Sequence, residues 1–224
     1  MNSDLDIGED VVSPYLWSRA LSHLDAVAIT HTHADHMGGA AAILANFRPR
    51  ELWLADASDP EMASVLRQAK DLGVRVVHHQ AGDQFEFGGA RVTVLAPDAE
   101  NLTMRRNDES LVMKFAYGNT AALLEGDAER RSEERIAAEE PRADLLKVAH
   151  HGSATSTIPQ LLAAVRPRFA VISVGARNSY GHPRGDVLAR LAEAHVQTYR
   201  TDLDGAVTFC LDGKTVSPCP PDFR

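Results

Sequence analysis

The alternation of apolar and polar positions divides the chain into three stretches. Up to about residue 80, short apolar runs alternate with segments of helical periodicity. Between 83 and 125, short runs with period two are separated by Gly-containing turns, which is typical of an antiparallel meander. Beyond Asp127 the alternation of helix and strand resumes. The chain therefore predicts a mixed α/β protein.

The first stretch predicts strands at Asp25–Thr30, Glu51–Ala55 and Val74–His78, with helices at Met37–Phe47 and Asp59–Leu72. The meander comprises Gln84–Phe87, Ala90–Leu95, Leu111–Tyr117 and Thr120–Leu124. The last stretch predicts helices at Arg130–Glu140, Ile158–Val165 and Arg184–Ala194, strands at Asp144–Ala149, Phe169–Val174 and Gln197–Arg200, and a closing hairpin of Ala206–Leu211 and Lys214–Ser217.

Length and composition fit one globular domain. The 224 residues are 44% hydrophobic, and no segment separates two domains by its composition, so we expect a single domain over 1–224 with a Pro-rich tail at 217–224. No apolar run approaches the roughly 20 residues of a membrane span, and Met1 does not open a signal peptide. We expect a soluble chain without a membrane segment.

The formal net charge is −8, so no global positive field attracts nucleic acid. Any polyanionic substrate would have to be held locally. The basic residues are scattered, and solvated surface positions explain most of them; Lys147, inside an apolar strand, is the exception. The others are Arg105, Arg106, Lys114, Arg166, Arg168, Arg177 and Arg184.

The chain has two cysteines, Cys210 in a predicted strand and Cys219 in the tail. This spacing makes neither a zinc ribbon nor a disulfide framework. A disulfide between them is allowed but not supported by the sequence, and the redox compartment stays undetermined.

Candidate metal-ligating residues are concentrated where the first predicted strand meets a helix. Thr30-His31-Thr32-His33-Ala34-Asp35-His36 carries three histidines and one aspartate within six positions. Imidazole and carboxylate suit zinc, manganese or iron, and alternate residues of an extended turn point the same way. His31 and His33 can therefore share one ion, while Asp35 and His36 face another. The isolated His23, His78, His79 and His195 are interpreted as ordinary surface or hydrogen-bonded residues.

Further candidate ligands follow later strands. Asp127 comes just after a strand and a glycine, which suits a carboxylate between two ions, although aspartate at that position could also cap the next helix. Lys147-Val148-Ala149-His150-His151-Gly152 again delivers histidines to a turn; one could bind metal, and the other could contact a substrate oxygen or pass a proton to a leaving group. His182 is the remaining candidate.

Taken together, these motifs resemble the metallo-β-lactamase superfamily, an αββα sandwich of metal-dependent hydrolases. Within it, the match is closer to the C-terminal domain of the ComEC family of DNA-internalisation competence proteins. The resemblance spans about Asp6 to Leu211. It rests on the motifs Val12–Arg19, Asn107–Val112, Leu146–Ser153, Ser173–Gly175 with Gly181–Pro183, and Asp202–Ala206.

Two departures from the family pattern stand out. The family domain normally begins with additional strands, so the chain is expected to lack its first amino-terminal strands, as well as the membrane channel of the full-length proteins. Where many members carry another histidine about twenty residues before the bridging aspartate, this chain has Asn107. An amide there, or the adjacent Asp108, would be a weak ligand or an outer contact and would favour manganese or magnesium over zinc.

The resulting hypothesis is a two-metal phosphodiester hydrolase. His31, His33 and Asp127 hold one ion, and Asp35, His36, Asp127 and His151 hold the other; the native metal, zinc or manganese with magnesium as a further choice, is left open. A metal-activated water attacks phosphorus. Asp35 orients that water, Lys147 offsets the developing charge, and His150 or His182 assists the departing oxygen.

By resemblance, the substrate is DNA, degraded during uptake in natural transformation, and the setting is a domain of a multi-pass protein of the cell membrane. Two other functions stay open. One is another hydrolase on the same scaffold, acting on a small phosphodiester, thioester or lactone. The other is a non-catalytic remnant or binding module.

Overall fold

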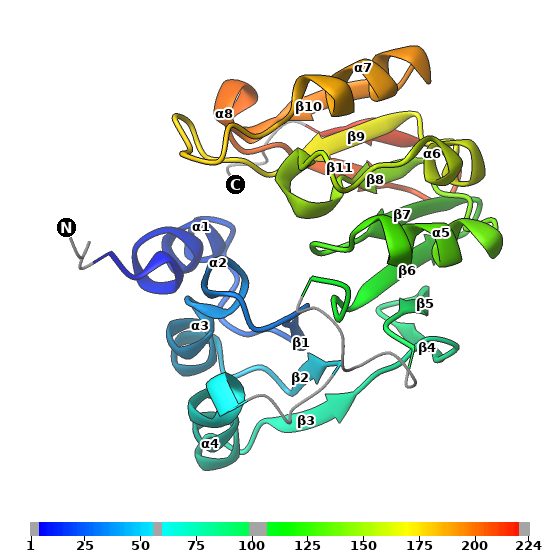
Figure 1. Ribbon diagram of the computed structural model, residues 1–224. Coiled ribbons are helices and arrows are strands. Elements are labelled where there is room, and N and C mark those ends of the chain that lie inside the picture. The colour runs from blue at the N-terminus through cyan, green and yellow to red at the C-terminus, as the bar shows by residue number, and fades with distance from the viewer. Residues whose placement is uncertain (1–4, 56–59, 99–106, 220–224) are drawn as a thin grey trace. The chain divides into compact units, whose positions relative to one another are not determined.

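The computed structural model describes residues 5–55, 60–98 and 107–219 (Figure 1). The described residues divide into two compact units, one up to residue 79 and one from residue 80 onward. Each unit has its own sheets and its own hydrophobic core. Asp59, where a helix was expected to begin, Arg105, Arg106 and the end of the Pro-rich tail lie outside the described residues.

The first unit is built on a three-stranded parallel sheet in the order β1-β2-β3. The three predicted strands are confirmed at β1 (Ala26–Ala28), β2 (Glu51–Leu54) and β3 (Arg75–His78). The core packs Ile29, Leu44, Leu52, Leu54 and Met62 together, so the strands and the helices that follow them bury a common apolar surface.

The helices of this unit differ from the sequence expectation in two places. The predicted helix Met37–Phe47 is interrupted at Gly38 and Gly39. A Cβ on Gly39 would lie 2.6 Å from the backbone nitrogen of Gly8, so this approach of two backbones requires glycine. The amino-terminal helical segment was not predicted. The helices are η1 (Gly8–Val12), α1 (Ser13–Ser18), α2 (Ala34–Met37), α3 (Ala40–Phe47), η2 (Pro60–Met62) and α4 (Ala63–Asp71).

The second unit contains a seven-stranded sheet in the order β10-β9-β8-β7-β6-β5-β4. Strands β4 to β7 pair antiparallel, which confirms the meander, and β7 to β10 pair parallel. The strands are β4 (Gln84–Phe87), β5 (Ala90–Ala96), β6 (Val112–Tyr117), β7 (Thr120–Leu124), β8 (Leu145–Lys147), β9 (Phe169–Ile172) and β10 (Gln197–Arg200).

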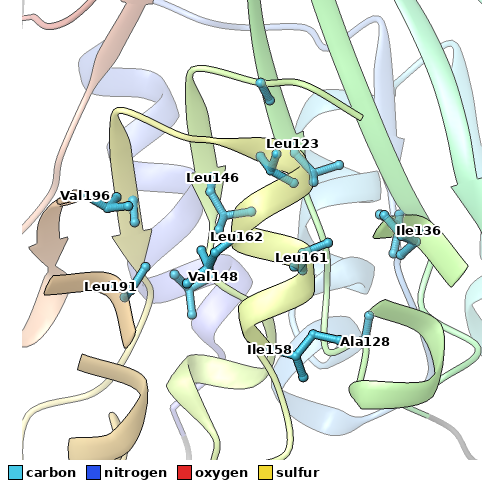
Figure 2. Close-up of a cluster of buried hydrophobic side chains, with 14 of the residues drawn as sticks. Leu123, Ala128, Ile136, Leu146, Val148, Ile158, Leu161, Leu162, Leu191 and Val196 are labelled. Atoms are coloured by element: carbon cyan, nitrogen blue, oxygen red, sulfur yellow. The ribbon is translucent and has the colours of Figure 1, made fainter. Parts of the chain in front are cut away.

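Helices cover this sheet through one continuous apolar core. Figure 2 shows Leu123 and Leu146 from the strands among Leu161, Leu162 and Ile136 from the helices, all buried. A core of this kind fixes the strand ends from which the loops of the site emerge. The helices are α5 (Arg130–Ala138), η4 (Ala149–Gly152), α6 (Pro159–Val165), α7 (Gly185–Glu193) and α8 (Thr201–Asp204).

The closing hairpin is present as β11 (Phe209–Leu211) paired antiparallel with β12 (Val216–Pro218). Cys210 and Cys219 form a disulfide across it, so the pairing that the sequence left unsupported is present. Phe209 packs on Phe169 of β9, with ring centroids 5.2 Å apart, which anchors the hairpin to the larger sheet.

Among the residues that the structure describes, no helix is long and apolar enough to cross a membrane.

Candidate metal centre

In the first unit, the predicted cluster His31, His33, Asp35 and His36 follows β1 and runs into α2. Parallel strands place the residues that follow them along one edge of the sheet, where ligands bind in open α/β sheets. His31 is buried at 6% exposure, the side chain of His36 is 13% exposed, and the Asp35 carboxylate is 61% exposed. The cluster thus ranges from buried imidazoles to an accessible carboxylate.

Thr30 organises two of these imidazoles. Its hydroxyl lies 3.0 Å from Nδ1 of His31 and 3.2 Å from Nδ1 of His36. A hydroxyl has two lone pairs and can accept an N–H from both rings. In that arrangement both Nε2 atoms carry the lone pairs that a metal ion needs.

The rings of His31 and His33 meet through their nitrogens, with Nε2 of His31 3.0 Å from Nδ1 of His33. The His31 and His36 ring centroids are 4.2 Å apart. Three imidazoles this close would repel one another if all were protonated. Neutral imidazoles that share a cation relieve this repulsion, so the donor set fits a divalent metal ion.

In the second unit, Asp127 lies in the turn that joins β7 to α5, and its side chain is only 2% exposed. The Asp127 N–H donates to the hydroxyl of Ser110 over 3.0 Å, and the ammonium of Lys147 donates to the carbonyl of Gly126 over 2.9 Å. The helix begins after Glu129 as its N-cap residue. Asp127 therefore does not occupy the N-cap position that was the alternative interpretation of this residue.

His150 and His151 follow β8 and approach Asp127 from the neighbouring strand. Nε2 of His150 is 3.9 Å and Nε2 of His151 is 3.8 Å from Oδ2 of Asp127. Both residues adopt left-handed backbone conformations, with φ of 48° and 54°. Such conformations cost about 1 kcal/mol or more each in residues other than glycine, and they concentrate at functional sites.

The tautomer of His151 is set by the hydrogen bond of its Nδ1 nitrogen. Nδ1 lies 2.7 Å from the backbone carbonyl of Ser173, which can only accept, so Nδ1 carries the hydrogen. In neutral His151, Nε2 then directs a lone pair at the carboxylate of Asp127, which is repulsive unless a proton or a metal ion supplies positive charge. The 3.8 Å separation is too long for a hydrogen bond but suits two ligands with bonds of about 2.0–2.2 Å to one ion.

His150 has a different neighbour. Its Nδ1 is 3.4 Å from Oε1 of Glu129, a residue that the sequence analysis did not single out. The same oxygen accepts from the amide of Asn107 over 3.1 Å and from the hydroxyl of Thr155 over 3.2 Å. Glu129 is therefore held in place by two donors and faces the imidazole of His150.

Asn107 and Asp108, the candidates for a weak ligand or an outer contact, brace this region. The Asn107 amide donates to Glu129, and Oδ1 of Asp108 accepts from the N–H of Glu129 over 3.2 Å and from the hydroxyl of Ser132 over 2.9 Å. Both side chains thus hold the beginning of α5, and through it Glu129.

His182 lies in the loop between β9 and α7, with its ring centroid 5.8 Å from that of His150. Asn178 holds the loop closed, because its Oδ1 accepts the N–H of His182 over 3.0 Å and its Nδ2 donates to the carbonyl of His182 over 2.8 Å. Burial, followed by the nearby His150 and His151, lowers the pKa of His182 below its usual value.

Comparison with known families assigns the class of protein. Residues 6–170, which are most of the chain, match the β-lactamase superfamily domain. The chain belongs to the metallo-β-lactamase superfamily, whose members are generally metal-dependent hydrolases and whose fold implies divalent metal ions.

Curated relatives of the chain include a ComE operon protein, a recombination protein and a competence protein. ComE operon protein 3 of Bacillus subtilis is 32% identical over 96% of this chain and 28% of the relative. Recombination protein 2 of Haemophilus influenzae is 30% identical over 88% of this chain and 23% of the relative. Competence protein ComA of Neisseria gonorrhoeae is 29% identical over 89% of this chain and 27% of the relative. The chain spans about a quarter of the length of these relatives.

Solved structures agree on the fold. CmlA, a diiron β-hydroxylase from Streptomyces venezuelae, superposes with a TM-score of 0.57 at 16% identity over 80% of this chain and 44% of that chain. A protein of Parabacteroides distasonis described as a metal-dependent hydrolase superposes with a TM-score of 0.51 at 16% identity, over 83% of this chain and 79% of that chain. At these identities the likeness establishes the metallo-β-lactamase fold alone, as the sequence motifs predicted.

Proposed function

We propose that the chain is a metal-dependent phosphodiester hydrolase that cleaves DNA. His31, His33 and Asp127 hold the first divalent ion, and Asp35, His36, Asp127 and His151 hold the second. Imidazole and carboxylate donors of this kind suit zinc or manganese, and magnesium is the third choice.

The observation that carries the proposal is the pairing of His151 with Asp127. The Ser173 carbonyl fixes the hydrogen on Nδ1, and Nε2 faces a carboxylate that is 2% exposed. A buried carboxylate opposite an imidazole lone pair needs a cation, and a histidine whose other nitrogen donates to a carbonyl is the usual form of a metal ligand.

Divalent ions bound here would activate water and neutralise charge on a phosphodiester. The chain's own groups would do the rest. Asp35, the exposed carboxylate of the cluster, accepts a hydrogen bond from the attacking water and orients it. The Lys147 ammonium holds the Gly126 carbonyl and adds positive charge beside Asp127, which favours an anionic transition state.

The leaving oxygen needs a proton, and His150 is the proposed donor. Its Nδ1 faces Glu129, which stabilises the protonated ring and sets its orientation, while Nε2 points to the side of Asp127. His182, whose pKa is lowered by burial, is assigned to contact with the substrate.

DNA uptake is the proposed setting. The support is the set of curated relatives, which include a competence protein and a ComE operon protein. In a longer protein of their kind, the partner of this chain would be a membrane channel domain, and the nuclease would act on DNA during its import.

The experiment is hydrolysis of single- and double-stranded DNA by the purified chain with Mn²⁺ or Zn²⁺, compared with the Asp35→Ala/His36→Ala double variant. We expect metal-dependent cleavage that falls at least 100-fold in the double variant, more than outer contacts of a metal site usually account for. The matched control is His23→Ala, an exposed histidine away from the cluster. Undiminished cleavage by the double variant would overturn the proposal.

The same assay distinguishes the other functions. Hydrolysis of bis(p-nitrophenyl) phosphate without cleavage of polynucleotides would indicate a small-diester hydrolase, and activity on thioesters or lactones alone would indicate acyl transfer. A folded chain that binds no metal would indicate a remnant or a binding module. Each of these results contradicts the DNase proposal.

A further inference from the structure

Tyr180 is the most exposed of the large hydrophobic side chains on the described residues, at 77%. It lies in the loop between β9 and α7, drawn in yellow in Figure 1. Single exposed apolar residues are common on protein surfaces and need no explanation by themselves. The position of this ring relative to the candidate site is what distinguishes it.

The Tyr180 ring is stacked on the imidazole of His182, with an interplanar angle of 12° and centroids 5.9 Å apart. His182 in turn contacts His150 at 5.8 Å, and His150 lies 3.9 Å from Asp127. Three rings therefore lead from the buried carboxylate to solvent. The outermost ring has one face on His182.

Hydrogen bonds hold the backbone of the loop that carries this ring. Asn178 bonds both the N–H and the carbonyl of His182, which closes a short turn around Tyr180, and it also donates to the carbonyl of Gly175 over 3.1 Å. The N–H of Arg184 donates to the carbonyl of Gly152 over 2.9 Å, which ties the end of the loop to the turn that carries the histidines. A ring fixed in this way loses little entropy when a ligand stacks on it.

The loop that carries Tyr180 also carries positive charge. Arg177 and Arg184 belong to the same loop, both are exposed, and no carboxylate of the described residues forms an ion pair with either of them. In a chain of net charge −8, a loop that carries two exposed arginines and an exposed aromatic ring favours a ligand that combines negative charge with a flat ring. A nucleotide of a polynucleotide is such a ligand.

We propose that Tyr180 is a stacking platform for an unpaired base of the nucleic acid substrate, adjacent to the scissile phosphodiester. This inference rests on the proposed phosphodiesterase function. A base within a duplex is already stacked on its neighbours, so the ring selects single-stranded or locally unpaired substrate. Because every base has a flat face, the contact is tolerant of sequence. Tyr180 is a specificity-determining residue and takes no part in bond breaking.

The test compares Tyr180→Ala, Tyr180→Phe and Tyr180→Trp on oligothymidylate and on a base-free strand of the same length made of abasic residues. We expect Tyr180→Ala to raise KM for oligothymidylate about 10-fold, the order of one lost base contact, with kcat within about twofold. Phenylalanine and tryptophan should restore KM. On the base-free strand, Tyr180→Ala and the unsubstituted chain should have equal KM.

The matched control is Tyr117→Ala. Tyr117 is also exposed, at 46%, and pairs with Thr120 at the beginning of β7, whereas Asp127 follows the end of that strand. This variant should leave both KM values unchanged, and thermal unfolding of each variant shows that it is folded. An unchanged KM in Tyr180→Ala on oligothymidylate, or an equal rise on the base-free strand, would overturn the proposal.

Binding separates this inference from the proposed function. If the chain cleaves no polynucleotide, fluorescence anisotropy with labelled oligothymidylate still measures the platform, and Tyr180→Ala should weaken binding about 10-fold. Loss of cleavage with retained, Tyr180-dependent binding would contradict the proposed function alone. Equal binding by the unsubstituted chain and Tyr180→Ala would contradict the platform.

Discussion

The imidazole of His151 bonds the carbonyl of Ser173 through Nδ1 and directs Nε2 toward the carboxylate of Asp127, 3.8 Å away. A backbone carbonyl at the end of β9 thus decides which nitrogen of a histidine after β8 is available for a metal ion. Three neighbouring parallel strands contribute, because Asp127 follows β7. The parallel part of the sheet is what places these groups at one edge.

Replacement of His151 by alanine should remove one metal equivalent and lower kcat/KM by more than the roughly 10- to 100-fold typical of outer contacts. Metal content by mass spectrometry and hydrolysis of oligothymidylate measure the two effects. His195→Ala is the matched control, because His195 is an exposed histidine that also has a left-handed backbone, and this variant should change neither. Full metal content in His151→Ala would show that His151 is not a ligand.

Glu129→Gln should lower kcat about 10-fold and leave KM and metal content unchanged, because a neutral amide stabilises the protonated ring of His150 less than a carboxylate does. Steady-state kinetics at a fixed metal concentration measure the change. Glu193→Gln, on an exposed turn of α7, is the control. If Glu129→Gln lost metal instead of turnover, the residue would be part of the metal site and not the partner of His150.

Thr30→Val should weaken metal binding by roughly 10- to 100-fold, since it removes the one hydroxyl that faces Nδ1 of both His31 and His36 while keeping the shape of the side chain. Thr30→Ser keeps the hydroxyl and should restore affinity. Calorimetric titration of the metal-free chain with Zn²⁺ measures the affinity of each variant. Equal affinity of the valine and serine variants would remove Thr30 from the account.

The buried carboxyl group of Glu133 should make the stability of the chain depend on pH. It is fully buried on α5, where its carboxylate accepts the N–H groups of Thr157 and Ile158, over 2.5 and 2.8 Å. Burial raises its pKa to about 7, against those two hydrogen bonds and the more distant Arg190 and Arg130. Burial, together with Glu133 itself, also raises the pKa of Glu125.

Because the folded pKa lies above the unfolded one, the folded chain keeps a proton that the unfolded chain releases. The contribution of Glu133 to the free energy of unfolding should therefore fall as pH rises from about 4.5 to 7, by about 3 kcal/mol, and Glu125 should add a change of the same sign. Urea unfolding of the metal-free chain at several pH values measures the slope. Glu133→Gln should reduce the slope, whereas Glu134→Gln, exposed on the same helix, should leave it unchanged. An unchanged slope in Glu133→Gln would show that the pH dependence comes from other groups.

Most strands and helices could be predicted from the sequence because their apolar periodicity is strong. The meander from Gln84 to Leu124 follows from alternating residues and glycine turns, and the strands before His31, Asp127 and His150 follow from short buried runs. The break at Gly38 and Gly39 was missed, since it depends on the approach of Gly8 from a distant part of the chain. Periodicity contains no information on such contacts.

The metal-ligand candidates could be named from the sequence because four donor side chains in six positions are uncommon. The residues that surround these candidates could not be predicted from the sequence. Thr30, Ser173 and Glu129 act through tertiary hydrogen bonds, and only the position of Glu129, two residues after Asp127, was a signal in the sequence. The left-handed backbone of His150 and His151 is likewise a product of the fold.

We propose that Asp127 binds both metal ions and that these ions make the chain a phosphodiesterase. The most direct measurement is the rate of oligothymidylate hydrolysis as a function of bound Mn²⁺ equivalents, for the unsubstituted chain and for Asp127→Asn. We expect activity that requires the second equivalent and that is lost, together with metal binding, in Asp127→Asn. Undiminished hydrolysis by Asp127→Asn, or by the chain after chelation, would contradict the account.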